Sequence, residues 1–185
     1  YISTLKNPEG LLIAVKKPFF DREAFFAGPS SAGVLLDNIQ DPGNLGNIIR
    51  ACCAFGIDGV FLYGEHCSPY NMKTVRASAG TVLNTPLFSS ADFHLEEFAG
   101  KGFTVFTSLS KKPGRSSLSL LDIKFPPRFI IAFGNEGHGF SSEISDIAHK
   151  SFHIPMNSSM ESLNLANSVS ITLFYLMKVS RVRGI

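Results

Sequence analysis

The sequence predicts an α/β domain in which helices cover both faces of a mostly parallel sheet. Short β-branched and aromatic runs alternate with amphipathic segments along the 185 residues, and parallel strands joined by helices produce this alternation. Hydrophobic residues make up 44% of the chain, which is enough to build a core of ordinary size. One domain is therefore expected.

Six runs are predicted as buried strands because each is short and rich in β-branched or aromatic residues. They cover residues 11–15, 34–37, 60–63, 103–107, 129–133 and 152–154. Between the first and second runs, residues 27–33 are rich in glycine, proline and serine. This composition predicts a boundary between an N-terminal tail, residues 1–30, and the main domain, residues 31–185.

The helix predicted between the second and third runs has an apolar stripe at helical spacing, formed by Leu45, Ile48, Ile49, Cys52 and Cys53. Asn44 is placed to cap its start, and Gly56 is expected to end it. Further helices are predicted over residues 71–79, 95–99, 141–148 and 162–179. The last has apolar residues on more than one stripe, so it is either a central core helix or a helix whose second face packs on another subunit.

Charge and cysteine usage restrict the class of protein. The 17 lysine and arginine residues against 15 aspartate and glutamate residues give a net charge of +2, so any nucleic-acid site would be a local patch. Three cysteines without paired spacing indicate reduced thiols. No apolar run approaches the roughly 20 residues that span a bilayer, and nothing resembles a secretory signal, so a cytoplasmic protein without membrane contact is expected. Because the chain opens on Tyr1 rather than methionine, a longer parent protein is also expected.

Three segments have the composition of ligand sites at strand ends. The first, DPGNLGNIIR at residues 41–50, runs from a strand end through a turn into the helix just described. Pro42 and Gly43 form the predicted turn, Gly46 admits a ligand or another backbone, and Arg50 lies opposite the apolar stripe. The alternative is an ordinary strand-to-helix connection with a surface arginine, although open α/β sheets bind their ligands at this end of their strands.

The second segment, FGNEGHGFSSEI at residues 133–144, places three glycines within six residues after an apolar strand. It matches neither GxGxxG nor GxxxxGK, which argues against a dinucleotide-binding Rossmann site and against a P-loop. Glu136, between the glycines, could pair with a ligand amine or with Arg50. The alternative is a glycine-rich connector without a ligand.

The third segment, HIPMNSSMESLNLANS at residues 153–168, leads from a strand through a polar loop into the last helix. Ser162 can serve as the N-cap of that helix, but the loop is longer and more polar than a cap requires. His149 and His153 are four residues apart, yet no carboxylate or cysteine joins them at ligand spacing. No metal is therefore expected.

These segments, together with VRASAG at residues 75–80, resemble the SpoU family of the SPOUT RNA methyltransferases from about Gly33 to the C-terminus, with a weaker echo in NPEGLLIAV near the start. The resemblance implies a C-terminal deep trefoil knot, a rare exception to unthreaded connections, as well as a homodimer and S-adenosylmethionine bound in the knot. The cofactor would contact Leu109, Gly134, Ile154 and Leu163. The implied catalytic residues are Asn44, Arg50, Glu136, Ser162 and Asn164.

The implied reaction moves a methyl group from S-adenosylmethionine to a ribose 2′-hydroxyl of tRNA or rRNA. Because a guanidinium has a pKa above about 12, we interpret Arg50 as binding a substrate phosphate and the nucleophile rather than as the base.

Residues 1–30 would be the tail of a linker from a separate RNA-binding domain. Ser158, where the family usually has glycine, favours the alternative of a catalytically inactive RNA-binding module with the same fold, and the missing phosphate-loop patterns disfavour another kind of nucleotide enzyme.

Overall fold

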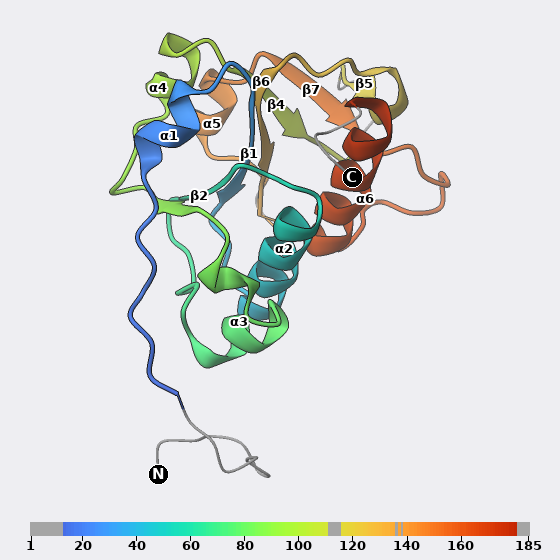
Figure 1. The fold of residues 1–185 in the computed structure, drawn as a ribbon. Helices are drawn as coiled ribbons and strands as arrows, with labels where there is room; N and C mark the ends of the chain where they lie inside the picture. Colours follow the sequence, from blue (N-terminus) through green and yellow to red (C-terminus); the bar gives the residue numbers. More distant parts are fainter. Residues whose placement is uncertain (1–12, 111–115, 136, 138, 181–185) are drawn as a thin grey trace.

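A seven-stranded parallel sheet organises the chain (Figure 1). The structure is a computed structural model that describes residues 13–110, 116–135, 137 and 139–180. Within these residues the strand order is β3-β2-β1-β6-β4-β7-β5, and every strand pairing is parallel. The strands are β1 (Ser31–Asp37), β2 (Gly59–Tyr63), β3 (Leu87–Ser89), β4 (Thr104–Ser108), β5 (Leu118–Ser119), β6 (Arg128–Phe133) and β7 (Lys150–His153). The α/β class with a mostly parallel sheet is confirmed.

Five of the six predicted strands are present, and two strands were not predicted. The run at residues 11–15 is not a strand where the structure describes it, since Ile13 and Val15 lie in exposed coil and residues 11 and 12 are outside the described part. The unpredicted strands β3 and β5 have three and two residues and lie at the two edges of the sheet. Such short edge strands have too few residues to show an alternating pattern.

Among the described residues α3, α5 and α6 are shorter than predicted, and α1 was not predicted. They are α1 (Arg22–Ala27), α2 (Pro42–Ala54), α3 (Met72–Ala77), α4 (Glu96–Gly100), α5 (Ser142–Asp146) and α6 (Leu165–Ser180), with 3-10 turns η1 (Thr81–Leu83) and η2 (Leu120–Asp122). As predicted, α2 ends before Gly56, whose φ of 66° suits a glycine. Its predicted start is wrong: Asp41 is the N-cap, and Asn44 lies inside the first turn.

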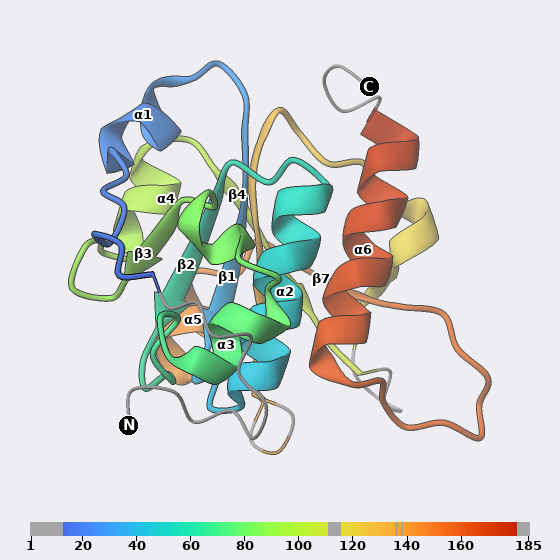
Figure 2. The same ribbon diagram turned by 60° about the horizontal axis from the view of Figure 1, so that its bottom comes forward.

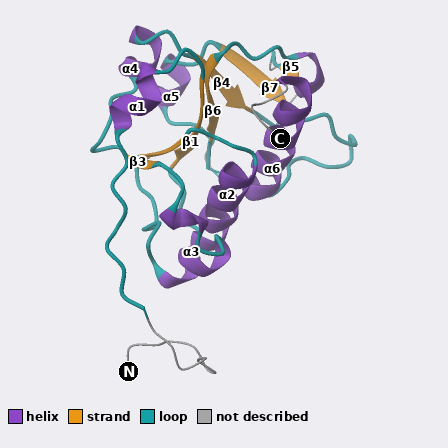
Figure 3. Ribbon diagram, in the orientation of Figure 1, coloured by secondary structure: helices purple, strands orange, loops and turns teal. Residues whose placement is uncertain are grey.

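Helices cover both faces of the sheet, as the colouring in Figure 3 makes clear. On one face α2 and α6 pack side by side over Val34, Leu36 and other aliphatic side chains (Figure 2). On the other face α1, α4 and α5 pack over Leu35, Phe61 and their neighbours. Because neighbouring residues of one strand point to opposite faces, one continuous apolar run supplies both cores.

Helix α1 lies inside the predicted tail and packs against the sheet. Phe25 and Phe26 are each 5% exposed. The ring of Phe25 lies 4.9 Å from that of Phe61 and 5.2 Å from that of Phe103, between centroids. This aromatic packing makes residues 22–27 part of the folded body, although they precede the predicted boundary at residue 31.

Helix α6 has one buried face and one exposed apolar patch. Its buried residues belong to the core with α2, whereas Ile171 is 42% exposed and Phe174 is 55% exposed. The ring of Phe174 lies 6.3 Å from that of Phe55 on α2. Packing in the core therefore accounts for the buried apolar residues of α6 but not for exposed Ile171 and Phe174.

None of the described helices is both long and apolar enough to cross a bilayer.

We expect Gly46→Ala to destabilise the fold by about 1–3 kcal/mol, the usual cost of overpacking. A methyl group at Gly46 would lie 2.5 Å from the Cβ of Ala77 and 2.7 Å from the carbonyl oxygen of Thr74, so α3 would have to move away from α2. Urea denaturation measures the loss. Gly100→Ala is the matched control, because the added methyl would meet no atom within 4 Å outside its chain neighbours and the nearby backbone of its own helix. Equal free energies of unfolding for the two variants would contradict the close approach of α2 and α3.

Candidate functional site

Three neighbouring strands bring three of the predicted cofactor residues to one edge of the sheet. Because β6, β4 and β7 are parallel and adjacent, their carboxyl ends lie at the same edge of the sheet: Ser108 pairs with Phe133 on one side and with Phe152 on the other. Leu109, Gly134 and Ile154 follow at this carboxyl edge, and the Leu109 amide donates to the Phe152 carbonyl at 2.8 Å. Open parallel sheets bind their ligands at this edge.

The glycine loop follows β6, and the structure describes its residues 134, 135, 137 and 139. The Asn135 amide donates to the Gly139 carbonyl at 3.1 Å, and the Gly139 amide donates back to the Asn135 carbonyl at 2.9 Å. A side chain at Gly134 would lie 2.7 Å from the Gly139 oxygen, and Gly139 has a φ of 75°. Both glycines are required by the geometry of the turn. The predicted role of Glu136 lies outside the described residues.

Asn44 and Asn164, 120 positions apart in the sequence, meet at the same edge. The Asn164 side-chain amide donates to the Asn44 Oδ1 at 3.0 Å. Asn164 Oδ1 also accepts from the backbone amides of Ala166, at 2.9 Å, and Asn167, at 3.3 Å. Asn164 is therefore both the N-cap of α6 and a partner of Asn44.

The predicted cap role of Ser162 is wrong. Ser162 is exposed in the loop three residues before α6 begins, and Asn164 occupies the capping position instead. Leu163, the remaining predicted cofactor residue, lies beside it and is partly buried.

The start of α2 explains why the Asn44 side chain faces Asn164. Asp41 Oδ1 accepts from the Asn44 backbone amide at 2.7 Å, and Asp41 Oδ2 accepts from Lys73 at 3.3 Å. The Asn44 amide, followed by Lys73, lowers the pKa of the exposed Asp41 carboxyl. Because Asp41 performs the capping, the side chain of Asn44 is available to the site.

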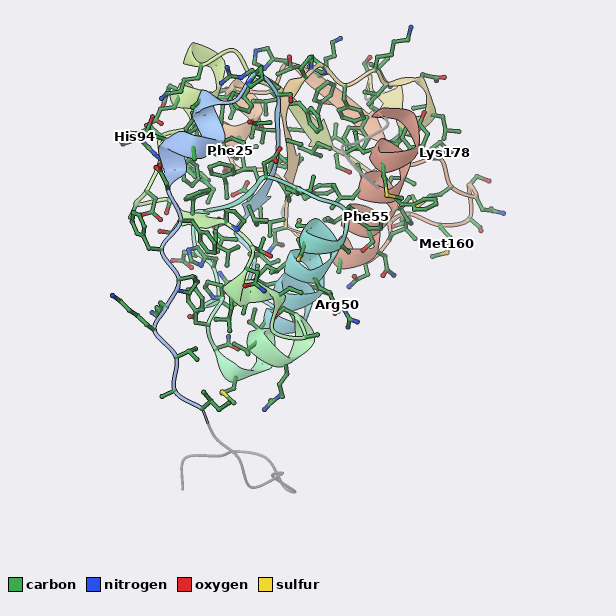
Figure 4. The ribbon with its side chains drawn as sticks, viewed as in Figure 1. Phe25, Arg50, Phe55, His94, Met160 and Lys178 are labelled. Carbon is green, nitrogen blue, oxygen red and sulfur yellow. The ribbon has the colours of Figure 1, made fainter. Side chains whose placement is uncertain are left out.

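Arg50 lies on the exposed side of α2, as predicted, and points away from the helix into solvent (Figure 4). Among the described residues it makes no ion pair within 4.0 Å. The proposed pairing with Glu136 cannot be placed, because Glu136 is outside them. An exposed guanidinium on this face can bind an anionic ligand.

His149 and His153 make hydrogen bonds to different parts of the fold. His149 Nδ1 accepts from the Val105 amide at 3.1 Å, and His153 Nδ1 lies 2.9 Å from the Ser117 hydroxyl. Within the described ranges no group of three or more histidine, cysteine, aspartate or glutamate side chains could hold a metal ion.

The sequence reasoning missed the residues at the end of β1. Asp37 is 1% exposed, and the following residue, Asn38, has a φ of 55°. The signal was an Asp-Asn pair directly after a buried strand, because asparagine tolerates this left-handed conformation better than most residues. Both residues contact the glycine loop or its end, as described below.

A family model described as the SpoU rRNA Methylase family matches residues 31–174. The chain belongs to this family. The resemblance of the three segments is thereby confirmed.

Individual relatives agree with this assignment. The chain is 31% identical to an uncharacterized tRNA/rRNA methyltransferase of Synechocystis over 91% of its length, and 34% identical to the 23S rRNA (adenosine(1067)-2′-O)-methyltransferase of Streptomyces laurentii over 98%. It spans 60% of the first protein and 67% of the second.

Solved structures resemble the fold closely. An AdoMet-bound rRNA methyltransferase from Sinorhizobium meliloti matches with a TM-score of 0.73 and 30% identity, covering 83% of this chain and 57% of that one. The SpoU methyltransferase AviRb from Streptomyces viridochromogenes, in complex with AdoMet, matches with a TM-score of 0.76 and 26% identity, covering 90% and 67%.

The double role of Asn164 can be separated by substitution. Asn164→Ala removes both the cap and the contact with Asn44, so we expect a loss of about 1 kcal/mol of unfolding free energy. Asn164→Ser keeps a capping oxygen but is too short to reach Asn44, so its stability should stay within a few tenths of a kcal/mol of the parent. Thermal and urea unfolding compare the two. Equal losses for both variants would mean that Asn164 does not cap α6.

Proposed function

We propose that this chain is an RNA methyltransferase that transfers a methyl group from S-adenosylmethionine to a ribose 2′-hydroxyl of tRNA or rRNA. The observation that carries the proposal is the meeting of Leu109, Gly134 and Ile154 at one carboxyl edge, with the Asn44–Asn164 contact joining the starts of α2 and α6. Relatives named as 23S rRNA 2′-O-methyltransferases and AdoMet-bound structures support the substrate and cofactor classes.

The residues at the carboxyl edge fit an adenosine-like cofactor. Leu109, Ile154 and Leu163 are apolar and partly buried, and Gly134 has no side chain that could block the end of β6. Apolar side chains and main-chain groups suit the faces and edges of adenine, which has no charge. When bound, S-adenosylmethionine supplies an activated methyl group.

This chain would supply alignment and electrostatic stabilisation to the transfer. The attacking ribose oxygen must be aligned with the methyl carbon and lose its proton. A guanidinium group donates hydrogen bonds, so that of Arg50 would hold a substrate phosphate and favour the deprotonated hydroxyl. Asn44 and Asn164 do not titrate, so they would orient the groups around the nucleophile.

Arg50→Ala should abolish methyl transfer while cofactor affinity changes less than about twofold, because the proposed cofactor residues lie on other elements. Transfer of labelled methyl groups to RNA and calorimetric titration with S-adenosylmethionine measure the two properties. Lys124→Ala, which removes an exposed cation before β6, is the control and should retain transfer. Loss of cofactor binding with Arg50→Ala would contradict the division of roles.

The same titration separates the enzyme from its alternative. A catalytically inactive RNA-binding module would bind RNA but not S-adenosylmethionine. Failure of the unsubstituted chain to bind the cofactor would therefore overturn the proposed function.

We also propose that the C-terminal part of the fold is a deep trefoil knot and that the chain forms a homodimer. The strand order supports the knot, because β6 enters between β1 and β4 and the later β7 enters between β4 and β5. The exposed patch of Ile171 and Phe174 on α6 supports the dimer, since a second copy would remove these side chains from water.

Light scattering during size-exclusion chromatography should give twice the chain mass of 20.1 kDa. Phe174→Glu should shift the protein toward the monomer, because a carboxylate would be desolvated in the interface. Phe19→Glu is the matched control, since Phe19 is 92% exposed on the N-terminal segment and should not affect assembly. A monomeric parent protein at micromolar concentration would contradict this use of α6.

A further inference from the structure

The glycine loop and the segment that follows it are tied to the end of β1 by two consecutive residues. The Asp37 carboxylate accepts from the backbone amide of Ser141 at 2.7 Å, just beyond the loop. The Asn38 carbonyl accepts from the side-chain amide of Asn135 at 3.1 Å, at the start of the loop. Two attachments on opposite sides of one short turn restrict its rotation as well as its position.

Asp37 and Asn38 are themselves held in place, by a hydrogen bond between their side chains and by the loop after β2. The Asn38 side chain donates to Asp37 at 2.7 Å through its amide and accepts from the Glu65 backbone amide at 2.9 Å through Oδ1. A side chain at Gly64 would lie 2.5 Å from Asn38 Oδ1. The loop after β2 therefore packs so closely on the Asn38 side chain that only glycine fits at position 64. The left-handed conformation of Asn38 makes these contacts possible.

The same segment leads directly to the Asn44–Asn164 pair. Ile39 is 3% exposed, and its carbonyl accepts from the Cys67 amide at 2.9 Å. Asp41 then caps α2 through the Asn44 backbone. The chain from Asp37 to Asn44 is therefore fixed at almost every step, with the glycine loop attached at one end and Asn44 at the other.

Burial makes the Asp37 contacts strong. A carboxylate that is 1% exposed has lost nearly all its water, so its hydrogen bonds with the Ser141 amide and the Asn38 amide compensate for that loss. Displacing the glycine loop would break the hydrogen bond between Ser141 and Asp37, and little water is available there to replace it. The loop thus has one strongly preferred position relative to α2.

We propose that Asp37 and Asn38 are positioning residues that set the distance between the cofactor's glycine loop and the Asn44–Asn164 pair. The proposal rests on the proposed function, in which the first holds the methyl donor and the second orients the acceptor. Neither side chain needs to touch cofactor or RNA. They would affect the reaction indirectly, by fixing the positions of the glycine loop and of the start of α2.

The first test compares Asp37→Asn with Asp58→Asn. Asp58 also accepts a backbone amide of β1, that of Ala32 at 2.8 Å, but at the opposite end of the strand. We expect hydrogen exchange at the Gly139 and Ser141 amides to accelerate about tenfold or more with Asp37→Asn and to stay unchanged with Asp58→Asn, because only the first variant removes the charged acceptor of the Ser141 amide.

The second measurement is calorimetric titration of both variants with S-adenosylmethionine. Asp37→Asn should bind about tenfold more weakly than the parent, as expected for the loss of one charge-assisted hydrogen bond that holds the loop. Asp58→Asn should bind like the parent even if both variants lose similar thermal stability. Equal weakening in the two variants, or unchanged exchange and affinity in Asp37→Asn, would overturn the proposal.

A second variant keeps the test decisive if Asp37→Asn does not fold. Asn135→Asp retains the oxygen that accepts from the Gly137 amide at 2.8 Å but replaces the amide that donates to the Asn38 carbonyl. It should show the same faster exchange at Gly139, and unchanged exchange would again overturn the proposal. Failure of the parent chain to bind S-adenosylmethionine would refute the proposed function, whereas the exchange measurement tests the attachment of the loop without any ligand.

Discussion

Parallel pairing of the strands, as far as the structure describes the chain, is the constraint on which the site depends. In a parallel sheet the carboxyl ends of neighbouring strands meet at one edge, so residues that follow distant strands become neighbours. Leu109, Gly134 and Ile154 come from three separate parts of the sequence and meet because β6, β4 and β7 are adjacent and in register. An antiparallel β4 would send Leu109 to the opposite edge.

The two faces of this sheet are packed with different side chains. The face under α1 and α4 is rich in phenylalanine, and the Phe61 ring lies within 5.1 Å of those of Phe88, Phe93 and Phe98, between centroids. The face under α2 and α6 is mainly aliphatic; Asn44 lies in the first turn of α2, and Asn164 caps α6. The aromatic packing stabilises the sheet from one side, while the helices that bear the proposed catalytic side chains pack on the other.

Much of the fold followed from periodicity, whereas the helix starts did not. Buried strands such as β1 and β6 are continuous apolar runs, and α2 has a clear apolar stripe, so both kinds of element were visible in the sequence. The caps were assigned wrongly because two residues near each boundary could cap. Pro42 distinguishes them at α2, since proline favours the first helical position and makes Asp41 the cap. No comparable marker separates Ser162 from Asn164. The contacts of Asp37 with Ser141 and of Asn38 with Asn135 could not be predicted, because they join residues about a hundred positions apart.

The amphipathic character of α2 gives its two adjacent cysteines opposite chemistry. Cys52 is fully buried, and desolvation raises the pKa of its thiol far above the usual range; burial also raises that of Cys67. Cys53, which the sequence predicted in the apolar stripe, is instead exposed and lies three residues after Arg50, on a neighbouring position of the helix surface. A thiol-reactive fluorophore would therefore attach preferentially to Cys53. Its fluorescence would respond to ligands that bind near Arg50, without any engineered cysteine.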